Sequence, residues 1–156
     1  SDLSAAFLLA QLEQCQKLTD KRLALWQSYY DNLIDLERSG YLAIQKIPAY
    51  NQHNAHLFYL KLESPRKRQA LIDHLKTKNI PSFFHYIPLH SSICGKQLGE
   101  FVGEDKYTTQ ESEKLLRLPI HYNISMADID YITTQINLFF KTQEQPELGQ
   151  SQYKNG

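Results

Sequence analysis

A stripe of apolar side chains at helical spacing runs through the first 38 residues, and it constrains the fold more than any other feature. Ser1 is a suitable N-cap and Gly40 a suitable C′ residue, so the pattern predicts one long helix, or two helices in line, over residues 2–38. At about 1.5 Å per residue, a single helix of that length would exceed the width of a small domain. We therefore expect residues 1–39 to connect two domains or subunits, with a broken helical hairpin inside one domain as the alternative. The stripe consists of Leu3, Ala6, Phe7, Ala10, Leu12, Leu18, Leu25, Trp26, Tyr29, Tyr30, Leu33 and Leu36.

Short strands and helices alternate through the remainder of the chain. Residues 41–54 are expected to be irregular or to form an edge, because Pro48 cannot donate a ladder hydrogen bond. In the strand predicted next, Phe58, Leu60 and Leu62 share one face. The predicted strands are 56–62, 80–87 and 116–120, the predicted helices 64–79, 108–115 and 125–141, and the predicted long loop 91–103.

Capping signals support these helices. Ser64 precedes Pro65, which favours the first helical position, and the spacing of Thr108 and Glu111 is typical of a capping box. The stretch from Ser125 to Asp128 is expected to cap the last helix. The order of elements, with helices gathered on one face of a small sheet, predicts an α+β fold with a long N-terminal helix. Residues 142–156 are polar, and we expect a flexible tail there.

Composition excludes several classes of function. The chain has 156 residues, enough for one domain, and its 17 basic and 17 acidic residues leave no net charge. A nucleic-acid-binding domain would favour a basic surface, so we expect no nucleic acid partner. No apolar run approaches transmembrane length, so we expect no membrane partner. Two isolated cysteines, Cys15 and Cys94, are typical of free thiols in the reducing cytoplasm.

The segment from Phe83 to His90 is apolar and aromatic, yet it contains two histidines and is interrupted by Pro88. It is predicted to leave the sheet as a rigid loop, and loops held by a scaffold often carry function. His85 is expected to hydrogen-bond a backbone carbonyl, whereas His90 is expected to point toward solvent or a ligand. No Asp, Glu or Cys is close enough in sequence to complete a ligand set, so no metal site is predicted.

Nucleophilic catalysis is only weakly indicated. Cys94 or Ser91 could act with His90 as a hydrolase, but neither a nucleophile elbow nor a third, orienting group is evident. The acidic residues are expected to be helix caps (Asp2, Glu111 and Asp128) or a solvated acidic loop (Glu100, Glu104 and Asp105).

Several ordered motifs make the chain similar to a known family. Residues 1–140 resemble the C-terminal part of the DegT/DnrJ/EryC1/StrS family of pyridoxal-phosphate-dependent sugar aminotransferases. The motifs are Ser1 to Ala6, Ala10 to Leu12, Arg22 with Trp26 and Tyr29-Tyr30, Asn54 to Tyr59, His85 to His90, Gly103 to Thr109, and Ser112 to Pro119.

The resemblance implies a small C-terminal domain of a fold-type I aminotransferase, with a mostly antiparallel sheet, spanning residues 1–141. It implies pyridoxal 5'-phosphate as cofactor, a dTDP-sugar substrate with glutamate as donor, and a homodimer. The Schiff-base lysine and the phosphate cup of the family belong to a large domain that would precede Ser1, so no residue here is assigned as catalytic. We expect this chain alone to bind no cofactor and to be inactive. The segment matching Tyr86 to His90 lies at the mouth of the family's active-site cleft, which makes His90, His85 and Tyr86 candidate substrate contacts.

Two functional classes stay open. The chain begins without Met and already in helical pattern, so we expect it to be part of a longer enzyme. The alternative is a non-catalytic interaction module of the same fold that works alone. For His90, His85 and Tyr86, a purely structural role in a rigid interdomain turn is equally compatible with the pattern.

Overall fold

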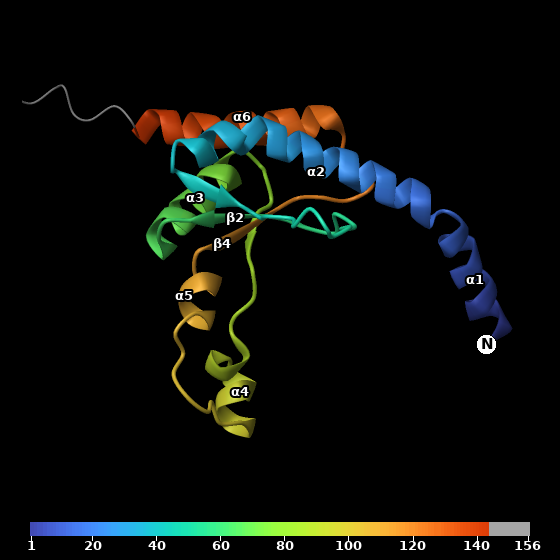
Figure 1. The fold of residues 1–156 in the computed structure, drawn as a ribbon, viewed down its shortest axis with the longest axis horizontal. Coiled ribbons are helices and arrows are strands. Elements are labelled where there is room, and N and C mark those ends of the chain that lie inside the picture. The colour runs from blue at the N-terminus through green and yellow to red at the C-terminus, as the bar shows by residue number, and fades with distance from the viewer. Residues whose placement is uncertain (144–156) are drawn as a thin grey trace, which may run out of the picture.

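The computed structural model describes residues 1–143 and is an α+β fold built on one four-stranded sheet (Figure 1). The strand order is β1-β2-β4-β3, and all neighbouring strands are antiparallel. The strands are β1 (Leu42–Ile44), β2 (Phe58–Leu62), β3 (Phe83–Phe84) and β4 (Leu115–Leu118). The helices are α1 (Asp2–Glu13), α2 (Cys15–Arg38), α3 (Pro65–Thr77), α4 (Ile93–Leu98), α5 (Thr108–Ser112), α6 (Met126–Gln143) and the 3₁₀ turn η1 (Leu89–Ser91).

One face of the sheet is buried beneath α2, α3 and α6, which confirms the predicted layering. Phe58, Leu60 and Leu62 alternate into this core along β2, because successive side chains of a strand point to opposite faces. The ring of Tyr29 on α2 stacks on Phe58 with centroids 4.8 Å apart. Burial of this shared apolar surface is the main stabilising contribution to the domain.

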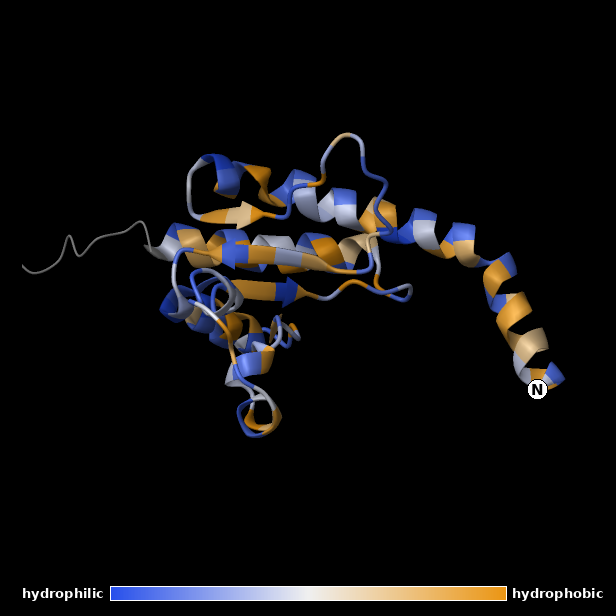
Figure 2. Ribbon diagram, turned by 60° about the horizontal axis from the view of Figure 1, so that its bottom comes forward, coloured by the Kyte–Doolittle hydropathy of each residue, from blue (hydrophilic) through white to orange (hydrophobic). Residues whose placement is uncertain are grey.

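The N-terminal stripe forms two helices in line, separated at Gln14. Ser1 caps α1, and Gly40 ends the second helix with φ of +79°, a conformation that favours glycine. The predicted caps at both ends are therefore confirmed. α2 carries the buried part of the stripe, whereas α1 buries none of its residues. Figure 2 shows that α1 is hydrophobic around most of its length although it extends away from the sheet.

The strand predicted at 80–87 is wrong in length and in burial. Only Phe83 and Phe84 pair with β4, and both side chains are exposed. Pro81 lacks a backbone N–H before the strand, and Tyr86 ends it with φ of +54°, outside the extended region. The ladder therefore covers two residues. The loop predicted at 91–103 is also corrected, because α4 lies within it.

Two of the three predicted caps after Gly40 are confirmed. Ser64 accepts from the backbone N–H of Lys67, and Ser125 accepts from that of Asp128. The box at Thr108 and Glu111 is wrong, because α5 has Tyr107 at its N-cap without a side-chain cap. Glu111 instead forms an ion pair with Lys61 on β2.

At the C-terminal end, α6 continues through Gln143, two residues beyond the expected end of the domain. The tail expected at 142–156 otherwise lies outside the described residues. Within residues 1–143, no helix is both long and apolar enough to cross a membrane.

Candidate functional site

The connection between β3 and β4 projects away from the sheet on the side opposite α2 and α6 (Figure 1). It contains η1, α4 and α5, and it begins at His85, just before Tyr86, whose positive φ redirects the chain. Such a backbone is strained for a residue with a bulky side chain, and strain of this kind is concentrated at functional segments. The three candidate residues His85, Tyr86 and His90 all lie at the start of this connection.

His90 is held inside the connection. Its Nε2 lies 2.9 Å from Asp105 Oδ2 and 3.3 Å from Thr109 Oγ1, and its ring packs against Phe101 with centroids 4.5 Å apart. Only 21% of the His90 side chain is exposed. His90 is therefore less exposed than the sequence predicts, since its Nε2 is already occupied by protein partners.

Asp105 is the functional-site residue that the sequence pattern missed. It was expected in a solvated acidic loop, but it joins His90 on η1 to Thr109 on α5, 19 residues further along the chain. Hydrogen bonds from Thr109 are the largest cause that holds the pKa of Asp105 below its ordinary value, and His90 adds to them. The available signal was its position just before a short helix, where a carboxylate can accept backbone N–H groups.

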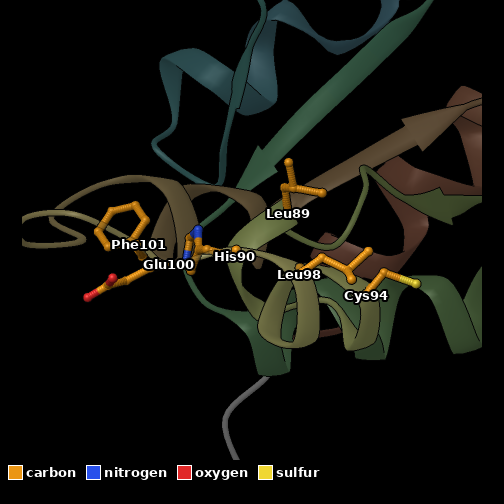
Figure 3. A pocket seen from close by; sticks show the side chains of 8 residues that line it. Leu89, His90, Cys94, Leu98, Glu100 and Phe101 are labelled. Carbon is orange, nitrogen blue, oxygen red and sulfur yellow. The ribbon is translucent and has the colours of Figure 1, made fainter.

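A cavity of about 490 Å³ opens beside His90, lined largely by apolar side chains of η1, α4 and the segment after it (Figure 3). α4 lies so close to η1 that a Cβ at Gly95 would come within 1.7 Å of the Leu89 carbonyl oxygen. Only glycine therefore fits at this contact. The lining comprises Leu89, His90, Cys94, Gly95, Leu98, Gly99, Glu100 and Phe101.

The geometry gives the hydrolase hypothesis no support. In Figure 3 the thiol of Cys94 points away from the imidazole of His90. The hydroxyl of Ser91 donates to the carbonyl oxygen of Pro88 at 3.0 Å, so it is not directed at His90 either. Asp105 supplies the orienting group that the sequence did not reveal, but it and Thr109 contact the same imidazole nitrogen. That nitrogen is thus not available as a base for a nucleophile.

His85 and Tyr86 form a separate cluster at the sheet. The His85 ring lies 4.9 Å from that of Tyr86 and 6.3 Å from that of Tyr59 on β2, measured between centroids. The guanidinium of Arg117 on β4 lies 5.1 Å from the Tyr86 ring centre, a cation–π distance. The pKa of His85 is lowered, first by burial and then by the positive charges of Arg117 and His56. The expected carbonyl partner is not observed, since Nδ1 of His85 is buried without a hydrogen bond.

Solved structures share this fold. An aminotransferase from Brucella abortus is 26% identical with a TM-score of 0.68, and it matches 86% of this chain and 34% of its own. PseC of Helicobacter pylori, an aminotransferase in pseudoaminic acid biosynthesis, is 18% identical with a TM-score of 0.73 over 86% of this chain and 36% of its own. Spr1654 of Streptococcus pneumoniae, in its pyridoxal phosphate form, is 21% identical with a TM-score of 0.73 over 91% of this chain and 36% of its own. The chain thus spans about a third of the length of these proteins.

The cavities described above lack groups that pyridoxal phosphate requires. That cofactor needs a lysine for its Schiff base and a partner for its pyridine nitrogen inside an enclosed site. The lining of the cavity beside His90 contains no lysine, and neither does that of the three other cavities around His56. Lys61 is paired with Glu111, and Lys106 with Glu104. Within the described part of the chain, no group of three or more His, Cys, Asp and Glu side chains could hold a metal ion.

A comparison of the sequence with protein families gives a match over most of the chain. The model of the DegT/DnrJ/EryC1/StrS aminotransferase family matches residues 1–137, which include every described strand and most of α6. The four-stranded antiparallel sheet with its helical cover agrees with the solved aminotransferases. This chain belongs to the DegT/DnrJ/EryC1/StrS aminotransferase family.

Proposed function

We propose that this chain is the small domain of a pyridoxal-phosphate-dependent sugar aminotransferase, and that it acts together with a large domain that lies outside these residues. The family match over residues 1–137 is the observation that carries the proposal. Coverage of about a third of the solved relatives supports a larger catalytic unit. The lysine-free cavities are in accord with a cofactor that is bound elsewhere in that unit.

Helix α1 supports the proposed domain arrangement. Leu3, Phe7 and Leu9 are 82%, 70% and 58% exposed, and Leu8 and Leu12 are also uncovered. A contiguous apolar surface of this kind marks an interface, because its contact with water is unfavourable. We propose that the large domain covers α1, that residues 1–39 connect the two domains, and that the small domain extends to about residue 141.

The proposed substrate is a dTDP-4-keto-6-deoxyhexose, which receives its amino group from glutamate. The motif set resembles that of dTDP-4-amino-4,6-dideoxygalactose transaminase, so we propose a cytoplasmic, homodimeric enzyme that supplies a sugar for enterobacterial common antigen or O-antigen. His90, His85 and Tyr86 are the proposed substrate contacts of this domain. Tyr86 is supported by its 68% exposure, and His90 by its position in the wall of the cavity.

A cofactor-trapping experiment tests whether the cofactor-binding lysine lies outside this chain. The chain is incubated with pyridoxal phosphate and borohydride, which traps a Schiff base as a stable lysine adduct. We expect no stoichiometric adduct at any single lysine and no transaminase turnover. The protein encoded by the complete reading frame, treated in parallel, should form one adduct outside the residues described here. A single stoichiometric adduct within this chain, together with turnover, would refute the proposal.

The second candidate function is an interaction module that works alone, and exposed α1 is the observation that favours it. The reading frame that encodes Ser1 separates the two candidates. Upstream codons for a lysine-bearing large domain would establish the aminotransferase. A native start codon close to Ser1 would favour the module.

A further inference from the structure

A groove at the end of the sheet beneath α2 is rich in cationic side chains. Two adjoining cavities share His56, Ile120 and His121, and we call them together the His56 groove. The first, of about 350 Å³, is lined by Arg22 of α2, and the second, of about 320 Å³, by Arg117 of β4. Figure 1 shows the segments that precede β2 and follow β4 extending from the sheet in the same direction, below α2.

Among residues 1–143, no carboxylate forms an ion pair with Arg22 or Arg117. Arg22 makes one long hydrogen bond, 3.4 Å to Thr19, and its Nε is buried without a partner. Arg117 contacts the ring of Tyr86, and its Nε is likewise buried without a partner. No Asp or Glu belongs to the lining of either cavity. A partly buried guanidinium without an acceptor is costly, so a pair of them indicates a missing anionic partner.

The surroundings of the His56 groove add a further positive charge. Lys21 lies 4.5 Å from the ring centre of Tyr122, which also lines the first cavity. Burial, followed by the nearby Arg117 and His56, lowers the pKa of His85 beside this groove. Asp128 accepts from the hydroxyl and the backbone N–H of Ser125, and these bonds, with a smaller contribution from His121, hold its pKa below its ordinary value.

His56 is oriented for an anion by the strained turn before it. Ala55 is 2% exposed with φ of +49°, a conformation that is rare for a residue with a Cβ. Asn54 Oδ1 then accepts from the backbone N–H of His56 and lies 3.1 Å from its Nδ1. With Nδ1 bonded to Asn54, Nε2 is the imidazole nitrogen that remains for a ligand.

We infer that the His56 groove binds the diphosphate of a nucleotide, with Arg22 and Arg117 as its principal contacts. Arginine recognises phosphate oxygens bidentately, and one arginine lines each of the two cavities that share His56 and His121, which suits a group with two phosphates. Tyr122 and Phe83, 41% and 59% exposed, lie in the groove as stacking surfaces for a base. The choice of a nucleotide rests on the proposed function, whereas the anion site rests on the arginines themselves.

The test uses the 156-residue chain labelled with nitrogen-15 and titrated separately with dTDP, inorganic pyrophosphate, thymidine and glutamate. The Nε–H signals of Arg22 and Arg117 should shift with pyrophosphate and with dTDP, and dTDP should bind more tightly. Arg22→Gln and Arg117→Gln should each weaken dTDP binding by at least about tenfold, because each removes a charge-assisted contact. Arg66→Gln, on the exposed surface of α3, should bind like the parent chain. Circular dichroism confirms that each variant retains its helices.

Three results would overturn the inference. The first is a folded parent chain in which neither Nε–H signal responds to pyrophosphate at millimolar concentration. The second is dTDP binding that survives both arginine substitutions. The third is a response to glutamate alone, which would identify a carboxylate site instead. If the complete enzyme shows no transaminase turnover while pyrophosphate still shifts both signals, the proposed function fails and the anion site stands.

Discussion

Tyr29→Phe tests the bond that ties α2 to the end of β4. The Tyr29 hydroxyl donates to the carbonyl oxygen of Pro119 at 2.7 Å, although the two residues are 90 positions apart. The substitution removes one oxygen atom and keeps the ring that stacks on Phe58. Since Pro119 then loses its donor, we expect a loss of about 1–2 kcal/mol in the free energy of unfolding. For a domain of this size, that corresponds to a thermal midpoint roughly 2–8 °C lower.

Urea unfolding followed by tryptophan fluorescence measures this effect. Trp26 is the single tryptophan of the chain, and it is 6% exposed beside Phe58, so its emission reports the same core. Tyr30→Phe is the matched control, because Tyr30 is adjacent on α2 and its ring stacks on Trp26, but its hydroxyl makes no hydrogen bond in the structure. We expect the control to change stability by less than about 0.5 kcal/mol. If Tyr29→Phe and the parent chain have the same urea midpoint, the hydrogen bond to Pro119 contributes nothing to stability, and the reasoning is refuted.

The pH dependence gives this prediction a second readout. Burial, with a smaller contribution from Asp128, raises the pKa of Tyr29 far above its ordinary value of 10.0. Below that value the phenol is protonated in both the folded and the unfolded chain, so its contribution does not change with pH. Above it, only the unfolded chain releases the proton, and the folded state loses stability as pH rises. The advantage of the parent over Tyr29→Phe should therefore shrink above about pH 10.

Three further predictions concern α1 and the connection between β3 and β4. The chain should self-associate through α1, so Phe7→Glu should lower its sedimentation coefficient at high concentration. Val102→Glu, at a more exposed apolar position outside α1, is the control and should not lower it. A strictly monomeric parent chain would contradict this prediction. In the complete enzyme, His90→Ala should lower kcat/KM for the nucleotide sugar more than Asp105→Asn does, and equal losses with equal thermal midpoints would show that His90 only holds the loop. The contacts with Thr109 and His90, which lower the pKa of Asp105, stabilise the folded state above about pH 4, and this contribution is lost as pH falls through the native pKa. Asp105→Asn and the parent chain should therefore differ in urea midpoint at neutral pH and converge in acid; a gap that persists in acid would exclude this titration.

Some elements of the fold follow from the sequence alone, because their signals are local. The periodicity of α2, the alternation of Phe58, Leu60 and Leu62, and the Ser64 and Ser125 caps all depend on neighbours within a few residues. The α+β class also follows, since the order of elements limits how the apolar faces can pack. The family resemblance rests on the same local motifs, and the match over residues 1–137 confirms it.

Tertiary structure decided how residues distant in sequence meet. The sequence predicts a solvated loop around Asp105, but the connection folds back and brings Asp105 to His90. The sequence predicts that Glu111 caps a helix, but β2 places Lys61 beside it. The aromatic run after Ile80 resembles a buried strand, but β3 lies at the sheet edge, where only Phe83 and Phe84 can pair. The His56 groove likewise arises only when α2 and the end of β4 converge, so that two arginines 95 residues apart lie along one groove. Periodicity and capping are properties of neighbouring residues, whereas ion pairs and grooves depend on the path of the whole chain.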